Sequence, residues 1–368
     1  MNLNHIKCLV VLLILCGSLS CTQQKTNLNI TIIELDNTLP FNFNEKFELS
    51  HKVQLETTDE SLITNIWDIA FIDDYIYISD LALRLLVFDL EGNFIRQIGS
   101  RGQGPGEYME VNDFYIENYR IVVIDSQRGR RLVYDRNGEF LYAEQLPINP
   151  MYVQHINDDL IIYYIGNRGG ELATAGQDYF YRLLFLNANN NVVSGFLPSP
   201  SRHRGHLFDT GSPFFEHSDN LFFIEPMNDT IYQVIESRIE PILVVDFGRY
   251  RRPRDFRNRT DPHYWFRVMR DNSYVRGMIS FYKFPNMVYF RAFIGEGPAR
   301  HIFYDKISQR TFVASTLIDT VNNINVSPRS FRGEKEYFLS IINPDDFLDR
   351  EEDLFNEDNP TLVFYRLR

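Results

Sequence analysis

The feature that most constrains the fold is an internal repeat with a period of about 45 residues. The stretch 76–98 aligns with the stretch 121–145, so that Asp80 matches Asp125. Both stretches hold short runs rich in β-branched and aromatic residues, separated by turn residues such as Asn137-Gly138. Several runs are apolar on both faces, which is typical of strands buried between neighbouring sheets. The repeat therefore predicts a β-propeller.

Weaker copies of the repeat fill the rest of the chain, over residues 160–187, 220–247 and 287–315, with a further strand at 361–367. We predict an all-β, six-bladed β-propeller with four-stranded antiparallel blades, and seven blades are the alternative. Segments 30–35 and 46–55 are expected to complete the blade that holds the C-terminal strand. The N- and C-terminal strands then close the ring and leave no sheet edge open.

Residues 1–20 have the pattern of a lipoprotein signal peptide. Lys7 precedes an apolar run over 8–16, which is far shorter than the roughly 20 residues of a membrane-spanning helix. Ser18-Leu19-Ser20 leads to Cys21 and resembles the lipobox of bacterial lipoproteins. Removal of residues 1–20 leaves Cys21 as the sole cysteine, and lipid attachment would consume its thiol. Cleavage without lipidation is the alternative.

This reading divides the chain into three parts, a signal peptide over 1–20, a polar tether over 21–29 and one propeller domain over 30–368. We expect a protein of the bacterial cell envelope whose N-terminal lipid holds it in a membrane. Among bacterial lipoproteins an Asp after the cysteine favours the inner membrane. Thr22 stands there instead, which favours the outer membrane.

Three runs resemble segments of the six-bladed β-propeller lipoproteins of bacterial envelopes, which are related to NHL-repeat and TolB-like propellers. They are FIRQIGSRGQGPGEY at 94–108, NDTIY at 228–232 and NPTLVFYRL at 359–367. The resemblance implies the propeller fold and the envelope location. It implies no reaction, because that family carries no shared catalytic motif.

The segment 249–276 differs from the rest of this acidic chain, whose net charge is −12. It holds nine Arg and three Asp with aromatic residues between them, and is expected to be an insertion between blades. Guanidinium groups beside aromatic rings suit acidic groups and sugar rings. Candidate ligand-binding residues here are Arg251, Arg252, Arg254, Tyr264, Trp265 and Arg267, and weaker candidates elsewhere are Arg128, Arg130 and Arg131. The alternative is that these arginines pair with the acidic segment 345–358.

Sequence motifs for catalysis are missing. There is no GxSxG, and the glycines at 99–106 lack the Lys and Ser or Thr of a phosphate loop, so we expect them at turns. His203, His206 and Asp209 have a spacing open to metal binding, but we interpret them as solvated loop residues. No metal and no cofactor are therefore predicted.

The pattern favours a noncatalytic binding or scaffolding propeller that recognises a carbohydrate, a peptide or a partner protein at one mouth of the ring. The acidic balance argues against nucleic acid as a partner. The alternative is a metal-dependent hydrolase or lyase of the lactonase-like propeller type. Its candidate metal ligands are Asp68, Asp113 and Glu225.

Overall fold

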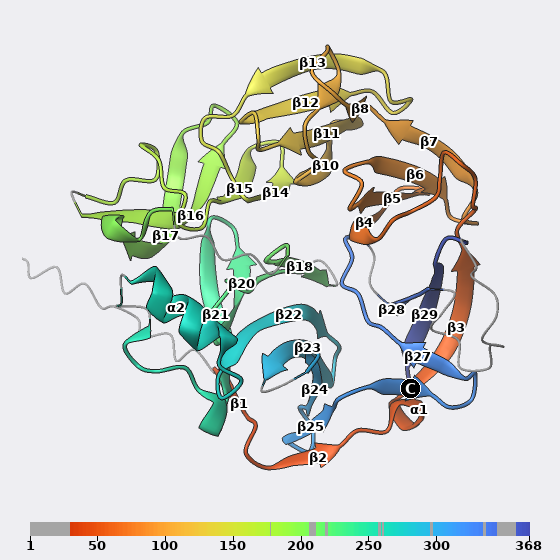
Figure 1. Ribbon diagram of the computed structural model, residues 1–368, viewed down its shortest axis with the longest axis vertical. Helices are drawn as coiled ribbons and strands as arrows, with labels where there is room; N and C mark the ends of the chain where they lie inside the picture. Colours follow the sequence, from red (N-terminus) through yellow and green to blue (C-terminus); the bar gives the residue numbers. More distant parts are fainter. Residues whose placement is uncertain are drawn as a thin grey trace, which may run out of the picture.

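The computed structural model describes residues 30–368 except 177, 206–210, 218–219, 257–258, 260, 295–296, 334–335 and 344–357. Its strands form six small sheets arranged in a ring around a central axis (Figure 1). Each sheet is built mainly of antiparallel strands, and in blades 1 to 3 these follow one another outward from the axis in chain order. The predicted all-β, six-bladed propeller is confirmed, and the seven-bladed alternative is wrong.

The first three blades are regular. Blade 1 contains β4 (Ile66–Ile72), β5 (Tyr75–Asp80), β6 (Leu85–Asp89) and β7 (Phe94–Ile98). Blade 2 contains β10 (Asp113–Glu117), β11 (Arg120–Asp125), β12 (Arg130–Tyr134) and β13 (Phe140–Gln145). Blade 3 contains β14 (Tyr152–Asn157), β15 (Leu160–Tyr164), β16 (Tyr179–Asn187) and β17 (Val192–Pro200).

The next two blades have a fifth, outer strand. Blade 4 contains β18 (Phe214–His217), β19 (Asn220–Phe223), β20 (Thr230–Ile235) and β21 (Arg238–Asp246), with β1 (Thr31–Glu34) outside. Blade 5 contains β22 (Val275–Lys283), β23 (Met287–Ile294), β24 (Arg300–Asp305) and β25 (Arg310–Ala314), with β2 (Thr38–Pro40) outside.

Blade 6 joins the two ends of the chain. It contains β28 (Phe338–Ile342), β29 (Thr361–Leu367) and β3 (Phe47–Gln54). Residues 327–332 lie on the side of β28 that faces the central axis. They are hydrogen-bonded to this strand, since Arg329 N donates to Leu339 O at 2.9 Å. The expected closure by N- and C-terminal strands is confirmed.

The expectation that 30–35 complete this closing blade is wrong. β1 pairs in parallel with β21 of blade 4, and Thr31 aligns with Leu243. Ile33 is fully buried there, in the apolar cluster between blades 4 and 5. By pairing with β21, β1 buries the Ile33 side chain. The same pairing supplies hydrogen-bond partners to the otherwise open edge of β21.

The remaining elements are short. They are α1 (Phe43–Lys46), β8 (Ser100–Arg101), β9 (Glu107–Tyr108), η1 (Ser201–His203), η2 (Gly248–Tyr250), α2 (Pro262–Arg270), β26 (Leu317–Asp319) and β27 (Ile324–Val326). Gly99 and Gly106, beside β8 and β9, have φ of +58° and +72°, so their expected place at turns is confirmed. Within the described ranges, no helix is long and apolar enough to cross a lipid bilayer.

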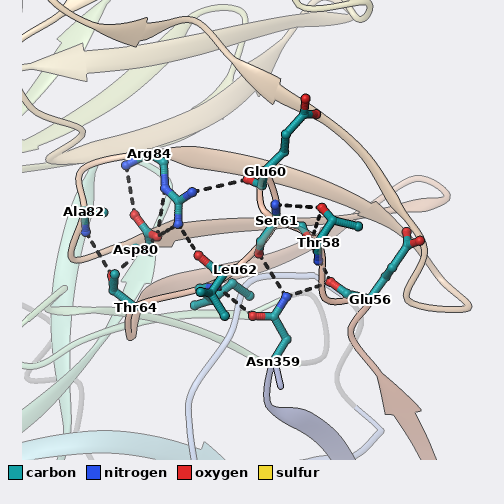
Figure 2. A network of polar contacts seen from close by, with 11 residues as sticks. Glu56, Thr58, Glu60, Ser61, Leu62, Thr64, Asp80, Ala82, Arg84 and Asn359 are labelled. Atoms are coloured by element: carbon teal, nitrogen blue, oxygen red, sulfur yellow. Dashed lines mark hydrogen bonds and ion pairs between the residues drawn. The ribbon is translucent and has the colours of Figure 1, made fainter. Parts of the chain in front are cut away.

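The ring closes where the C-terminal strand meets the loop 55–65 that leads into blade 1. Asn359 precedes β29 and is 1% exposed (Figure 2). Its side-chain nitrogen donates to Glu56 O at 2.7 Å and Ser61 O at 2.9 Å, and its side-chain oxygen accepts from Ile63 N at 2.7 Å. One buried amide therefore satisfies three backbone groups across the seam.

The loops between blades 1 to 5 leave from one face of the ring, here called the upper face. Because strands alternate in direction, the connection from an outer strand to the next inner strand lies at the same end as the loop between the two middle strands. Residues 201–213 and 247–274 are such connections, and 165–178 and 224–229 are such middle loops. Described residues from each of these four segments, Gly166, His203, Glu225 and Trp265, meet at the boundary of blades 3 and 4.

Candidate functional site

Helix α2 lies on the periphery of the ring beside β21 and β17 (Figure 1). Asp261 caps it, since its side chain accepts a hydrogen bond from His263 N at 3.0 Å, and Pro262 occupies its first turn. Its inner face carries Trp265 and Val268, each 4% exposed. The helix therefore begins where the sequence places a cap and a proline.

A small apolar cluster fastens α2 to blade 4. Trp265 and Val268 pack with Phe256 and with Met227, which lies in the middle loop of blade 4. The indole nitrogen of Trp265 donates to Phe256 O at 2.8 Å. Burying these side chains holds the segment 247–274 over the blade instead of leaving it as a loose loop.

A pocket of about 60 Å³ opens under this cluster. It lies between blades 3 and 4 and is lined by Tyr164, Gly166, Asn167, Arg182, His203, Glu225, Pro226, Met227, Phe256 and Trp265. We call it the α2 pocket. Its wall is apolar and aromatic, and a few polar groups converge in it, which is the usual composition of a ligand site.

An ion pair between two blades forms the polar part of the α2 pocket. Arg182 of blade 3 approaches Glu225 of blade 4, with Nε and Oε1 2.6 Å apart and Nη2 donating to Oε2 at 3.0 Å. The side chains are 18% and 4% exposed. A fork of this kind, partly shielded from water, is a rigid polar surface with oxygen and nitrogen atoms in fixed places.

His203 is a second buried polar group at the pocket. It is 4% exposed, its Nδ1 lies 3.4 Å from Ser199 Oγ, and its ring centre lies 5.3 Å from that of Trp265. The interpretation of His203 as a solvated loop residue is therefore wrong, because the insertion covers it. His206 and Asp209 lie outside the described residues.

Arg182 occupies a repeated position of the propeller. In blade 1 the equivalent residue is Arg84, since its backbone oxygen accepts a hydrogen bond from Asp80 N just as Arg182 O accepts one from Ile165 N. Arg84 also pairs with the Asp80 carboxylate, at 2.6 Å. Blade 3 has Ile165 at that place, so the Arg182 side chain crosses to Glu225 instead.

Of the candidate residues in the insertion, Trp265 lines the α2 pocket. The hydroxyl of Tyr264 donates to Asp255 Oδ1 at 3.0 Å, and the Arg267 guanidinium lies 5.6 Å from the Tyr264 ring centre. Both side chains stand outside the pocket, and Arg254 is exposed. The structure thus brings one aromatic candidate to the pocket.

Arg251 and Arg252 are held by acids of blade 4. Arg251 Nη2 donates to Asp246 Oδ1 at 2.7 Å, and Arg252 pairs with Asp229 and donates to Val275 O at 2.9 Å. The expected alternative partners at 345–358 lie, except for Asp358, outside the described residues. These two arginines therefore help to attach the insertion.

The weaker candidates lie on blade 2. Arg130 pairs with Asp125 and donates to Glu107 O, and Arg131 pairs with Glu117 at 3.1 Å and with Glu144 at 2.7 Å. Arg128 lies in the middle loop of that blade and is half-buried. None of the three lines the α2 pocket.

Two of the three candidate metal ligands converge in the central channel, but an arginine stands between them. Arg332 pairs with Asp68 and lies 3.3 Å from Asp113 Oδ1. Burial raises the pKa of Asp113 to about 6, although the charge of Arg332 opposes the shift. Glu225 is elsewhere, with Arg182. Among the described residues no three His, Cys, Asp or Glu are placed to hold a metal.

Sequence reasoning missed most of the pocket. Arg182 and Tyr164 were not considered, and His203 was considered only for metal and then interpreted as a solvated loop residue, because the burial of all three depends on how two blades and an insertion meet. One signal was present, the missing acid at Ile165, where the repeat has Asp80 and Asp125. A residue that departs from the repeat marks a place where the local contacts also depart from those of the other blades.

Comparison with solved structures supports the fold. A protein of Bacteroides fragilis NCTC 9343, described as exported, has a TM-score of 0.71 at 21% identity, over 92% of this chain and 100% of that one. A member of the DUF4221 family from Bacteroides vulgatus has a TM-score of 0.52 at 11% identity, over 88% and 99%. Streptogramin B lyase has a TM-score of 0.40 at 11% identity, over 88% and 99%. At these identities the likeness shows the fold alone.

No curated protein matches the chain. A family model does match it, over residues 27–366, and this range includes the α2 pocket. The chain belongs to the family described as Domain of unknown function (DUF4934).

Proposed function

We propose that this propeller is an exported binding module that recognises carbohydrate in the α2 pocket. The observation that carries the proposal is the departure of blade 3 from the repeat. Arg182 keeps the backbone position of its equivalents, but its side chain pairs with Glu225 across the blade boundary, under an aromatic wall supplied in part by the insertion. The pair therefore joins two blades at the edge of a pocket, and this position differs from its equivalents in blades 1 and 2.

The chemistry of the α2 pocket fits a sugar. Sugar rings offer apolar C–H faces and a set of hydroxyl groups. The rings of Trp265, Phe256 and Tyr164 supply apolar surface, while the Arg182–Glu225 fork supplies donors and acceptors. A pocket of about 60 Å³ takes one end of a ligand, so we expect a terminal residue of a glycan to bind.

The proposal includes the location of the protein in the bacterial cell envelope. Residues 1–20 have the pattern of a signal peptide, and Cys21 that of a lipid-attachment site at the outer membrane. The similar protein of Bacteroides fragilis is described as exported, which agrees with this reading. The finer resemblance to NHL-repeat and TolB-like lipoproteins points the same way.

The test is a glycan array followed by titration of the best oligosaccharide with wild type and Glu225→Gln. The substitution keeps the shape of the side chain and removes half of the charged fork. We expect binding to weaken about tenfold or more, and the free energy of unfolding to fall by about 1–2 kcal/mol.

Glu144→Gln is the matched control, because Glu144 also pairs with an arginine, Arg131, but stands outside the pocket. It should bind as wild type does. The proposal fails if no glycan binds the wild type, or if Glu225→Gln binds with unchanged affinity.

A further inference from the structure

Two arginines lie on neighbouring segments where blades 5 and 6 meet. Arg291 is on β23 and pairs with Ile279 of β22, while Arg329 is on the inner segment of blade 6, where its backbone oxygen accepts from the Tyr282 hydroxyl of β22. Arg329 Nη2 donates to Ile66 O at 2.7 Å. Burial, and next the neighbouring charge of Arg291, lower the pKa of Arg329.

Within the described part of the chain, neither arginine forms an ion pair with a carboxylate. The Nε of Arg291 is buried and has no hydrogen-bond partner among the described residues. Asp68 acts on Arg329 through its charge, but its carboxylate is taken by Arg332. Two guanidinium groups held together in a shielded place repel each other. An anion between or beside them would remove that repulsion.

A pocket of about 100 Å³ lies next to Arg329. We call it the mouth pocket; it is lined by Trp67, Asp68, Gly211, Ser212, Phe214, Phe215, Ile224, Met278, Ile279, Ser280, Arg329, Ser330, Phe331 and Arg332. Trp67 is 41% exposed and stands as an open aromatic surface at its rim. The pocket thus joins an aromatic ring, hydroxyl groups and guanidinium groups.

Ser280 shows that this wall is held under strain. It sits in a β-bulge of β22, where the register shifts between Ile279 and Phe281, with φ of +54°. Positive φ at a residue other than glycine costs energy and is retained where a structure needs a side chain in one place. Here the bulge aligns a hydroxyl-bearing residue with the lining of the mouth pocket.

We propose that the mouth pocket binds an oxyanion group, a carboxylate or a sulfate, through Arg329 with Arg291 behind it. Guanidinium groups match such anions in charge and in geometry. This site is separate from the α2 pocket and does not depend on it. The two are neighbours, because Ile224 lines one and Glu225 the other. If the α2 pocket binds a glycan as proposed above, a single acidic glycan would occupy both pockets.

The test uses sodium sulfate and sodium glucuronate as probes, with the full-length protein at constant sodium chloride. At about 10 mM, where general salt effects are small, we expect either probe to raise the melting temperature of wild type by about 3 °C or more. Arg291→Gln and Arg329→Gln should lose this rise. Without probe, Arg291→Gln should melt at or above the wild-type temperature, because it removes a like charge.

Arg120→Gln is the control, since Arg120 is an exposed arginine on blade 2 and should keep the full response. A response to one probe alone identifies carboxylate or sulfate as the group. The proposal is overturned if wild type responds no more than to added sodium chloride, or if Arg291→Gln keeps the response. Glu225→Gln separates the two sites, because it should lose glycan binding and keep the anion response.

Discussion

Blades 1 and 2 differ from blade 3 in how the end of the second strand is fixed. In blades 1 and 2 an arginine pairs with an aspartate of its own blade, Arg84 with Asp80 and Arg130 with Asp125. Those arginines also bind carbonyl groups of the preceding connection, as Figure 2 shows for Arg84 with Glu60. Each such unit is complete within itself.

Blade 3 is incomplete without its neighbour. Arg182 has Ile165 where the aspartate would be, and its middle loop runs over 165–178 instead of the short 81–84 of blade 1. The arginine therefore serves the boundary with blade 4, where the pocket is. The difference teaches that the same repeated side chain stabilises a blade when its partner lies within that blade, and joins two blades beside a pocket when the aspartate is replaced by Ile165.

The largest effect on stability is expected from removing the aspartate of the arginine–aspartate pair within blade 1. Asp80→Leu leaves the Arg84 charge without its partner in a place where the Asp80 side chain is fully buried. We expect the free energy of unfolding to fall by about 2–4 kcal/mol, measured by urea denaturation. The double variant Asp80→Leu with Arg84→Met should recover part of this loss. If Asp80→Leu alone is as stable as wild type, the Arg84–Asp80 ion pair makes no net contribution to stability.

The channel gives an intermediate case, since Arg332 of blade 6 holds Asp68 and Asp113 of other blades. Burial raises the folded-state pKa of Asp113 to about 6, above the roughly 3.9 of an aspartate in an unfolded chain, so the folded protein holds that proton more tightly. Its contribution to stability is therefore full below about pH 4 and is lost as the pH rises to 6, by at most about 1.4 kcal/mol per pH unit.

This dependence is measured by urea denaturation of wild type and Asp113→Asn between pH 4 and 7. The stability of wild type relative to the variant should decline from pH 4 to 6 and then stay level. Parallel curves for the two proteins would contradict the raised pKa.

The smallest effect is expected from replacing each arginine by lysine. Arg84→Lys loses the fork to Asp80 together with bonds to Glu60 O and Leu62 O, so we expect a cost of about 1–2 kcal/mol. Arg182→Lys loses the fork to Glu225 and should cost less than about 1 kcal/mol, but should weaken glycan binding. If the two variants lose the same free energy of unfolding, and Arg182→Lys binds glycan as wild type does, then blade 1 and blade 3 do not differ in the role of this arginine.

The repeat made the fold predictable, because Asp80 and Asp125 mark equivalent places and the strands near them are apolar on both faces. The segment 46–55 was also placed correctly, in the closing blade. The segment 30–35 was not, because an apolar strand fits any uncovered edge and the sequence does not say which. His203 was misjudged because the cover that buries it, Trp265, is distant in the chain.

The candidate insertion was recognised from its composition, but the roles inside it were not. Composition counts charges and cannot tell an arginine that fastens a segment, such as Arg252, from one that faces a ligand. That distinction needs the positions of acids such as Asp229.

The seam of the ring also governs the order in which the molecule can mature. Gln54 and Thr361, which bond across β3 and β29, are separated by 307 positions in the chain. β3 leaves the ribosome long before β29 and waits without this partner while the intervening strands are made. The ring therefore cannot close until β29 has been synthesised, however early the other blades fold.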